Sequence, residues 1–251
     1  MDLFTTFSTL PIANMADAFW DSTLPGQAIV IFLFIGSAWA WTIMVTKRGQ
    51  LRCAERMTHQ FLDAFRQERN APTALFTKRE KYVGSPLYAI YIEGCKALGF
   101  ELQAQGVDPS DLLMGDLTVD SQRRLTLGQL ETLRAVVDRT VADEALLLED
   151  QMGLLATAVS SAPFLGLLGT VWGVMDAFSG MAKSGSAALS AVAPGISGAL
   201  LTTIVGLLVA LPSMIGYNLL TSRIRTLSVE MDNFAQEFIT SIQNNFVIER
   251  N

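Results

Sequence analysis

Three long stretches of the chain are rich in apolar residues and contain no Asp, Glu, Lys or Arg. They cover residues 22–46, 151–175 and 184–222, which are 25, 25 and 39 residues long. A helix needs about 20 mostly apolar residues to cross a bilayer. The pattern therefore predicts three transmembrane helices, at residues 24–46, 151–181 and 194–220.

The third stretch is longer than one crossing requires. As a continuous helix, 39 residues would extend about 58 Å, whereas the hydrocarbon core is about 30 Å thick. We therefore expect a periplasmic loop at residues 182–193 and a helix that continues beyond the membrane. The final segment, 221–251, is predicted to be a cytoplasmic C-terminal helix.

Residues 47–150 have a different pattern, with dense charges of both signs. They hold 14 of the 18 Lys and Arg residues and 16 of the 24 Asp and Glu residues. Leu and Val recur mostly at three- and four-residue spacing, which is typical of helices. The pattern starts at Leu113 and Leu117 and ends at Leu146 and Leu147. Breaking residues at 70–72, 84–86 and 106–109 divide the region into about four helices. We predict an all-α membrane protein whose cytoplasmic helical domain is partly built from extensions of the membrane helices.

The distribution of basic residues predicts the orientation, because positively charged loops stay in the cytoplasm. Residues 1–21 contain three Asp and no Lys or Arg, and only Lys183 lies between the second and third spans. Basic residues follow the first and third spans, at Lys47, Arg48, Arg52, Arg56, Arg223 and Arg225. We expect a periplasmic N-terminus, a cytoplasmic C-terminus and a retained first span, since a signal peptide has its charges in the reverse order.

The periplasmic N-terminal segment, residues 1–23, allows two interpretations. Residues 8–20 are compatible with a short amphipathic helix that lies on the outer surface of the membrane. Their composition is equally compatible with a plain linker.

Composition excludes several classes of protein. Half of the residues are hydrophobic, 17% are charged, and the mean hydropathy is +0.35. Soluble domains carry about 25% charged residues, so a soluble two-domain enzyme is excluded. A net charge of −6 and a pI of 4.8 provide no basic surface for nucleic acid.

The metal-binding residue types are too few for an ordinary zinc site, which needs three or four N or S ligands. The chain has Cys53 and Cys95, 42 residues apart, and one histidine, His59. We expect no metal and no cofactor. Both cysteines are predicted to be packing residues rather than a disulfide, because cytoplasmic thiols stay reduced. His59 is predicted to be solvated, with a pH switch as the alternative.

Two stripes of small residues, each with one threonine, follow single faces of the second and third spans. They contain Pro163, Gly166, Thr170, Gly173 and Ala177, and Ala199, Thr203, Gly206, Ala210 and Ser213. Small residues allow helices to approach closely in a membrane. The stripes either pack against each other within one chain or line a central space in an oligomer.

Neither stripe contains a charged residue, so a proton path would need a carboxylate from another subunit. Asp176 is the one acid that adjoins either span. It is interpreted as a solvated helix end or as an entrance for cations at the mouth of a pathway.

Two of these segments resemble a known family. Residues 161–175, SAPFLGLLGTVWGVM, resemble the second membrane helix of the TolQ/ExbB/MotA proton-channel family. The third membrane helix of this family resembles residues 193–203, APGISGALLTT, together with Gly206 and residues 210–212 and 217–218. Residues 231–238, MDNFAQEF, look similar to the TolQ branch. Residues 50–150 resemble the family only in their general helical and charged character, not in a motif.

The resemblance implies a homopentamer whose second and third helices enclose a pore. The pore surrounds the single membrane helices of two TolR/ExbD-type subunits, whose aspartate carries the proton, and the complex works with a TolA/TonB-type protein. Thr170 and Thr203 stand where the family has its pore threonines. The implied ion pathway also takes in Thr202, Gly166, Gly173, Ala199 and Gly206.

Gly198 departs from the family, which usually has a glutamate at this position. Either pore water and the partner's carboxylate suffice, or the chain couples to another ion, or Asp176 partly substitutes. Thr202 adds a hydroxyl where alanine is commoner in relatives.

We predict from the resemblance a non-enzymatic, pore-forming subunit of a TolQ-like motor in the bacterial inner membrane. An ExbB-type role in TonB-dependent transport is the alternative, and a membrane signalling or scaffold protein is another. An intramembrane enzyme is the weakest alternative, because no histidine or acid lies in the apolar stretches.

Overall fold

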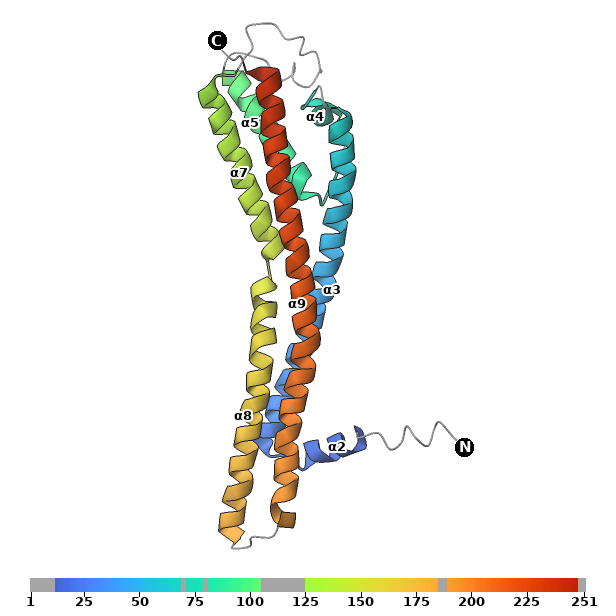
Figure 1. Cartoon of the computed structure of the whole chain (residues 1–251), viewed down its shortest axis with the longest axis vertical. Helices are drawn as coiled ribbons and strands as arrows, with labels where there is room; N and C mark the ends of the chain where they lie inside the picture. The colour runs from blue at the N-terminus through green and yellow to red at the C-terminus, as the bar shows by residue number, and fades with distance from the viewer. Residues whose placement is uncertain (1–11, 69–70, 79–80, 105–124, 185–188, 248–251) are drawn as a thin grey trace, which may run out of the picture. The chain divides into compact units, whose positions relative to one another are not determined.

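The computed structural model describes residues 12–68, 71–78, 81–104, 125–184 and 189–247. The described residues are almost entirely helical, as predicted, apart from one isolated parallel bridge between Leu125 and Val247. Their helices are α2 (Ile12–Trp20), α3 (Leu24–Gln67), α4 (Ala74–Lys78), α5 (Pro86–Ala104), α7 (Leu127–Glu149), α8 (Met152–Ser184) and α9 (Leu189–Phe246) (Figure 1).

The chain divides into two compact units. Unit 1 comprises Met1–Thr46 and Gln151–Leu219, and unit 2 comprises Lys47–Asp150 and Leu220–Asn251. Both α3, of 44 residues, and α9, of 58 residues, pass from one unit into the other without a break. Between α7 and α8 the helix is interrupted, and Gln151 there has a φ of 64°.

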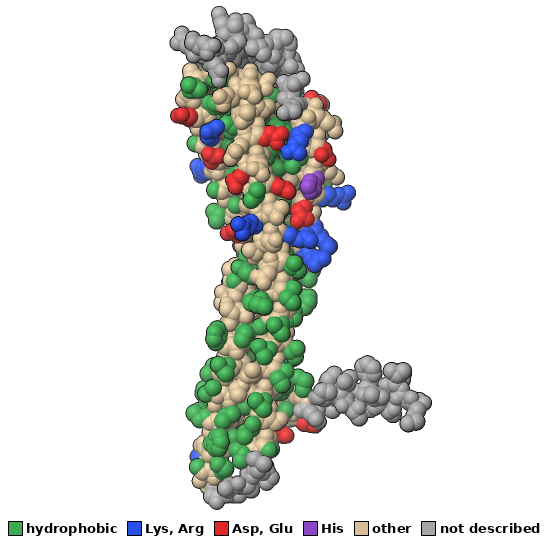
Figure 2. Space-filling model, viewed as in Figure 1, with side chains coloured by type: hydrophobic (Ala, Val, Ile, Leu, Met, Phe, Trp, Pro, Cys, Tyr) green, Lys and Arg blue, Asp and Glu red, His purple; other side chains and the backbone are tan. Residues whose placement is uncertain are grey.

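Within the described residues, three helical segments are long and apolar enough to cross a membrane, and they include the three predicted spans. Unit 1 exposes many large apolar side chains, which cover the lower part of Figure 2. Phe34, Phe164 and Leu208 are each more than half exposed. Exposed apolar surface of this extent is what a lipid environment would cover.

The core of unit 1 joins all four of its helices. Its buried residues come from α2, α3, α8 and α9, and they are Ala18, Val30, Leu33, Ala162, Leu201, Val205 and Ala210. Most of these side chains are small or branched, which allows the helices to pack closely.

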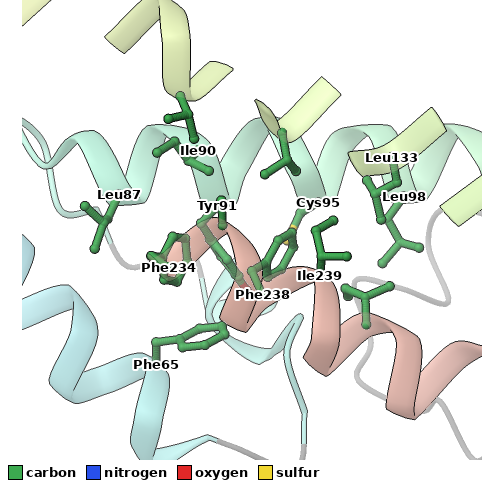
Figure 3. Close-up of a cluster of buried hydrophobic side chains, with 14 of the residues drawn as sticks. Phe65, Leu87, Ile90, Tyr91, Cys95, Leu98, Leu133, Phe234, Phe238 and Ile239 are labelled. Atoms are coloured by element: carbon green, nitrogen blue, oxygen red, sulfur yellow. The ribbon is translucent and has the colours of Figure 1, made fainter. Parts of the chain in front are cut away.

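The core of unit 2 combines aliphatic side chains with a cluster of aromatic ones (Figure 3). Phe65 of α3 meets Phe234 of α9 edge to face, with ring centroids 5.2 Å apart. Tyr91 of α5 contacts Phe238 in the same way at 5.5 Å, and its hydroxyl accepts the backbone N–H of Phe76 at 3.0 Å. Such aromatic pairs add stability beyond the area that they bury.

The two cysteines differ in their surroundings. Cys95 is buried beside Tyr91, and this burial raises the pKa of its thiol to about 12. Cys53 is exposed, so its prediction as a packing residue is wrong. Both cysteines are free, and His59 is exposed as predicted.

Several predicted boundaries differ from the structure. Residues 12–20 form a helix rather than a linker. Helix α8 extends to Ser184 and α9 begins at Leu189, so both helices enter the range predicted as a loop. Pro194 lies inside α9, because a membrane helix tolerates proline where neighbouring helices satisfy the freed backbone groups. The predicted pattern residues Leu113 and Leu117 and the break at 106–109 lie outside the described residues.

The break at 84–86 has a clear backbone cause. Gly84 has a φ of 94°, in the region that favours glycine, and Pro86 then begins α5. Proline suits this first helical position because its missing N–H would be unpaired there in any case.

Lys47 lies where α3 enters unit 2, and it is buried. Its ammonium group donates to the backbone carbonyl oxygens of Leu147 and Leu148, each at 3.3 Å. These carbonyls are in the last turn of α7, where no helical N–H is available to them. The lysine therefore fixes the end of α7 to the side of α3.

Candidate functional site

The small-residue stripes of α8 and α9 face each other in unit 1. A Cβ added to Gly206 would lie 2.7 Å from the carbonyl oxygen of Ala162, and one on Gly166 would lie 2.9 Å from that of Thr202. Further along, a Cβ on Gly173 would lie 2.7 Å from the Cβ of Ala199. Only glycine allows the two backbones to come this close.

Three threonine hydroxyls meet at the centre of this contact. The hydroxyl of Thr170 is hydrogen-bonded to that of Thr203, and it lies 3.2 Å from the carbonyl oxygen of Ala199 on the opposite helix. In return, the hydroxyls of Thr202 and Thr203 reach the carbonyl oxygen of Gly166 at 2.9 and 3.1 Å. Each hydroxyl has one hydrogen and several acceptors in reach, so these bonds can exchange.

The three threonines differ in accessibility. Thr202 is fully buried, and its hydroxyl also lies 2.7 Å from the carbonyl oxygen of Ala199. Thr170 and Thr203 are only partly buried.

The described residues around this hydroxyl cluster include no ionisable group. Asp176 is exposed on α8, beyond Gly173, and is not part of the contact between α8 and α9. Across the described part of the chain, no group of three His, Cys, Asp or Glu side chains is placed to hold a metal ion. The cluster can accept and donate hydrogen bonds, but it cannot release a proton of its own at neutral pH.

Gly198 is buried on a different side of α9. A Cβ at this position would lie 2.8 Å from the Cα of Ser22 and 3.0 Å from the carbonyl oxygen of Ala18. The turn between α2 and α3 thus occupies the space beside Gly198. No side chain fits there without displacing that turn.

The structure brings the predicted site residues together as one helix contact. Thr202, Gly166, Gly173, Ala199 and Gly206 are all buried within a single chain. This arrangement accounts for both stripes by packing within one chain, and it leaves the Thr170–Thr203 pair as the part that a central space could reach.

Sequence reasoning missed two features of the site. The carbonyl oxygen of Gly166 is the common acceptor for three threonines, and no residue type signals the role of a backbone atom. Gly169 allows the side chain of Thr202 to insert, since a Cβ there would overlap it. Gly169 and Gly173 are four residues apart, a spacing that favours close approach of another helix, but the spacing does not identify which residue approaches.

Comparison with known proteins identifies the same segments. Residues 116–233 match the family described as the MotA/TolQ/ExbB proton channel family, and this range contains all of the threonines and glycines above. The Tol-Pal system protein TolQ of Pseudomonas aeruginosa is 33% identical over 218 residues, which is 84% of this chain and 85% of that protein.

Other relatives belong to two groups. TolQ of Haemophilus influenzae is 28% identical over 90% of this chain and 92% of its own length. The biopolymer transport protein ExbB of Xanthomonas campestris pv. campestris is 29% identical over 83% of this chain and 77% of its own length. Together with the three apolar helices, these matches indicate an inner-membrane protein.

Proposed function

Because the chain belongs to the MotA/TolQ/ExbB proton channel family, we propose that it is the pore-forming subunit of a proton-driven motor that does mechanical work on the cell envelope. The hydroxyl pair of Thr170 and Thr203 is the observation that carries this proposal. It is a polar, partly buried site in a contact that is made mostly of small and apolar residues. Moving one charge down 100 mV releases about 2.3 kcal/mol, and several protons supply the work of a stroke.

In this proposal five copies surround a central pore, and Thr170 and Thr203 line it. The buried residues act through packing, because Gly166, Gly173 and Gly206 allow the approach that places the two hydroxyls together. The hydrogen bond from the Thr202 hydroxyl to the carbonyl oxygen of Ala199 stabilises α9 next to the Thr170–Thr203 pair.

The proton carrier comes from a partner subunit. The described hydroxyl cluster has no carboxylate, and the space beside Gly198 is filled by Ser22 and Ala18. We infer that a TolR/ExbD-type subunit, in two copies, brings an aspartate into the pore beside the threonines. A TolA/TonB-type protein then receives the motion. Asp176 is placed at the outer mouth, where its exposed carboxylate attracts cations.

The orientation follows from the basic residues, with the N-terminus in the periplasm and the C-terminus in the cytoplasm. Unit 2 is then the cytoplasmic helical domain. Its exposed charges, seen in the upper part of Figure 2, suit an aqueous compartment.

The proposal is tested by replacing each pore threonine with valine, which keeps the shape and removes the hydroxyl. Thr170→Val and Thr203→Val are expected to abolish proton-dependent activity in cells while the complex still assembles. Thr157→Val is the matched control, because Thr157 is an exposed residue of α8 whose hydroxyl bonds only its own helix, to the carbonyl of Gly153 at 2.9 Å. If both pore variants support full envelope integrity, the assignment of the pore is wrong.

Assembly is tested separately. Co-purification with a single-span partner, followed by native mass spectrometry, is expected to give five copies of this chain with two of the partner. A monomer without a partner would overturn the proposal.

Similarity to ExbB proteins favours a second candidate, in which the same pore energises TonB-dependent transport across the outer membrane. Deletion of the gene distinguishes the two roles. Loss of envelope integrity supports the Tol-Pal role, whereas loss of a TonB-dependent uptake with an intact envelope supports the transport role.

A further inference from the structure

Unit 2 has an exposed basic face on α3. Arg48, Arg52 and Arg56 follow one another at four-residue spacing, and His59 continues the same face. All four are exposed, and within the described part of the chain no ion pair is found for the three arginines. Arginines at this spacing lie along one side of a helix and present a row of charge.

Helix α7 has an exposed acidic face. Glu131, Asp138 and Glu149 are seven and eleven residues apart, so they lie on one side of the helix. Ala135 and Ala142 are exposed between them on the same side, and so is Arg134, so the three acids exceed the basic residues of this face by two. The small alanines let another helix approach, while the acids provide the charge. The ion pairs found in the described residues do not involve these three acids.

The contact of Lys47 with the end of α7 sets the two faces in register. The chain leaves this contact along α3 and returns to it along α7, and each residue advances about 1.5 Å. Arg56 comes nine residues after Lys47, so it lies about 14 Å along α3 from the contact. Asp138 comes ten residues before Leu148, so it lies about 15 Å along α7 from the same contact. Arg56 and Asp138, which carry opposite charges, are therefore at matching heights.

Beyond the Lys47 contact, the two faces do not meet within one chain. Over most of unit 2, α7 and α3 lie on opposite sides of α9 (Figure 1), and both faces are exposed. In a ring of copies around an axis along the membrane normal, each residue has the same height in every copy. Only groups at matching heights can then pair between neighbours, which is the condition that these residues meet.

We propose that the basic face of α3 binds the acidic face of α7 on a neighbouring copy of this chain, with Arg56 beside Asp138. The inference rests on the proposed function, because that function requires a closed ring. Exposed ion pairs contribute little affinity, so this interface fixes which faces meet and at what height. The membrane helices supply most of the stability of the ring.

Disulfide crosslinking of the full chain in native membranes tests the interface. The background is Cys53→Ser, which removes the exposed thiol and leaves the buried Cys95. Arg56→Cys with Asp138→Cys in one chain is expected to give, after oxidation with copper phenanthroline, a ladder of linked oligomers. Each single variant is expected to remain monomeric on a denaturing gel, and co-expression of the two single variants to stop at dimers.

A matched control tests the register. Arg56→Cys with Glu149→Cys uses the same acidic face, but the two sites differ in height by about 16 Å. A disulfide needs Cα atoms within about 7 Å, so no ladder is expected. Charge reversal gives an independent readout: Arg56→Glu and Asp138→Arg should each lower the yield of oligomer several-fold, and the double reversal should restore it.

The outcomes separate the two proposals. A ladder supports the interface. An oligomer in native mass spectrometry without a ladder overturns the interface and leaves the proposed function intact, as would happen if anionic lipid headgroups occupied the arginines. A monomer overturns both.

Discussion

Gly198 of α9 lies directly against Ser22, which separates α2 from α3. A Cβ on Gly198 would be 2.8 Å from both the Cα and the Cβ of Ser22. The resemblance implies a glutamate at position 198, but in this chain Gly198 is a packing residue. The same contact holds Ala18 of α2 in the core of unit 1.

Gly198→Ala is expected to displace the turn between α2 and α3, because the new methyl meets backbone as well as side chain. Overpacking of this kind typically costs about 1–3 kcal/mol. Labelling of Ala18→Cys, a position that is 9% exposed, by an impermeant maleimide should become faster in the variant. Gly36→Ala is the matched control, since a Cβ at Gly36 meets nothing within 4 Å. Equal labelling in Gly198→Ala and Gly36→Ala would contradict the role given to Gly198.

Gly206→Ala is expected to separate α8 from α9, because its Cβ would lie 2.7 Å from the carbonyl oxygen of Ala162. The apparent Tm of the purified protein in detergent should fall, and the function that depends on the Thr170–Thr203 pair should fall with it. Gly153→Ala on α8 serves as the control, because it enters open space and gains about 1 kcal/mol of helix propensity. A Tm for Gly206→Ala equal to that of Gly153→Ala would show that the helices do not approach as described.

Lys47→Met is expected to fray the end of α7. The carbonyls of Leu147 and Leu148 lose their donor, and a typical hydrogen bond contributes about 0.5–1.5 kcal/mol. Hydrogen–deuterium exchange should accelerate in the last turn of α7 and remain unchanged in α5. Lys96→Met is the control, because Lys96 is 58% exposed and pairs only with Glu93 of its own helix. Unchanged exchange in the last turn of α7 would argue against the contact.

Cys53 is expected to react with maleimide at neutral pH, while Cys95 stays unreactive until the protein unfolds. The thiolate is the reactive form, and burial raises the pKa of Cys95 from 9.0 to about 12. A raised pKa in the folded state means that this thiol stabilises unit 2 fully below about pH 9, and that the stabilisation is lost as the pH rises toward 12. Denaturant melts between pH 8 and 11 measure this, and Cys95→Ala should reduce the pH dependence. Labelling of both cysteines at equal rates in the folded protein would refute the burial.

The sequence was sufficient for the three spans, the all-helical fold and the family. These depend on the length of apolar stretches, on three- and four-residue spacing and on the motif around Thr170, and each is local along the chain. It also identified both small-residue stripes, because small residues allow helix backbones to approach in a membrane, but it left open whether the stripes pack against each other or line a central space. The loop at residues 182–193 was predicted less well, since proline disfavours a helix interior locally but Pro194 is tolerated inside α9.

What the sequence determined by itself was where the chain is apolar, where it is helical and which faces are small. The tertiary structure decided what those faces meet: that Thr202 is buried while Thr170 and Thr203 stay partly open, that Gly198 packs on Ser22, and that Lys47 reaches the end of α7. The physical reason is that these outcomes depend on contacts between residues that lie far apart in the chain. Periodicity places a residue on one side of its own helix, but the identity of its neighbour is set only when two helices pack together.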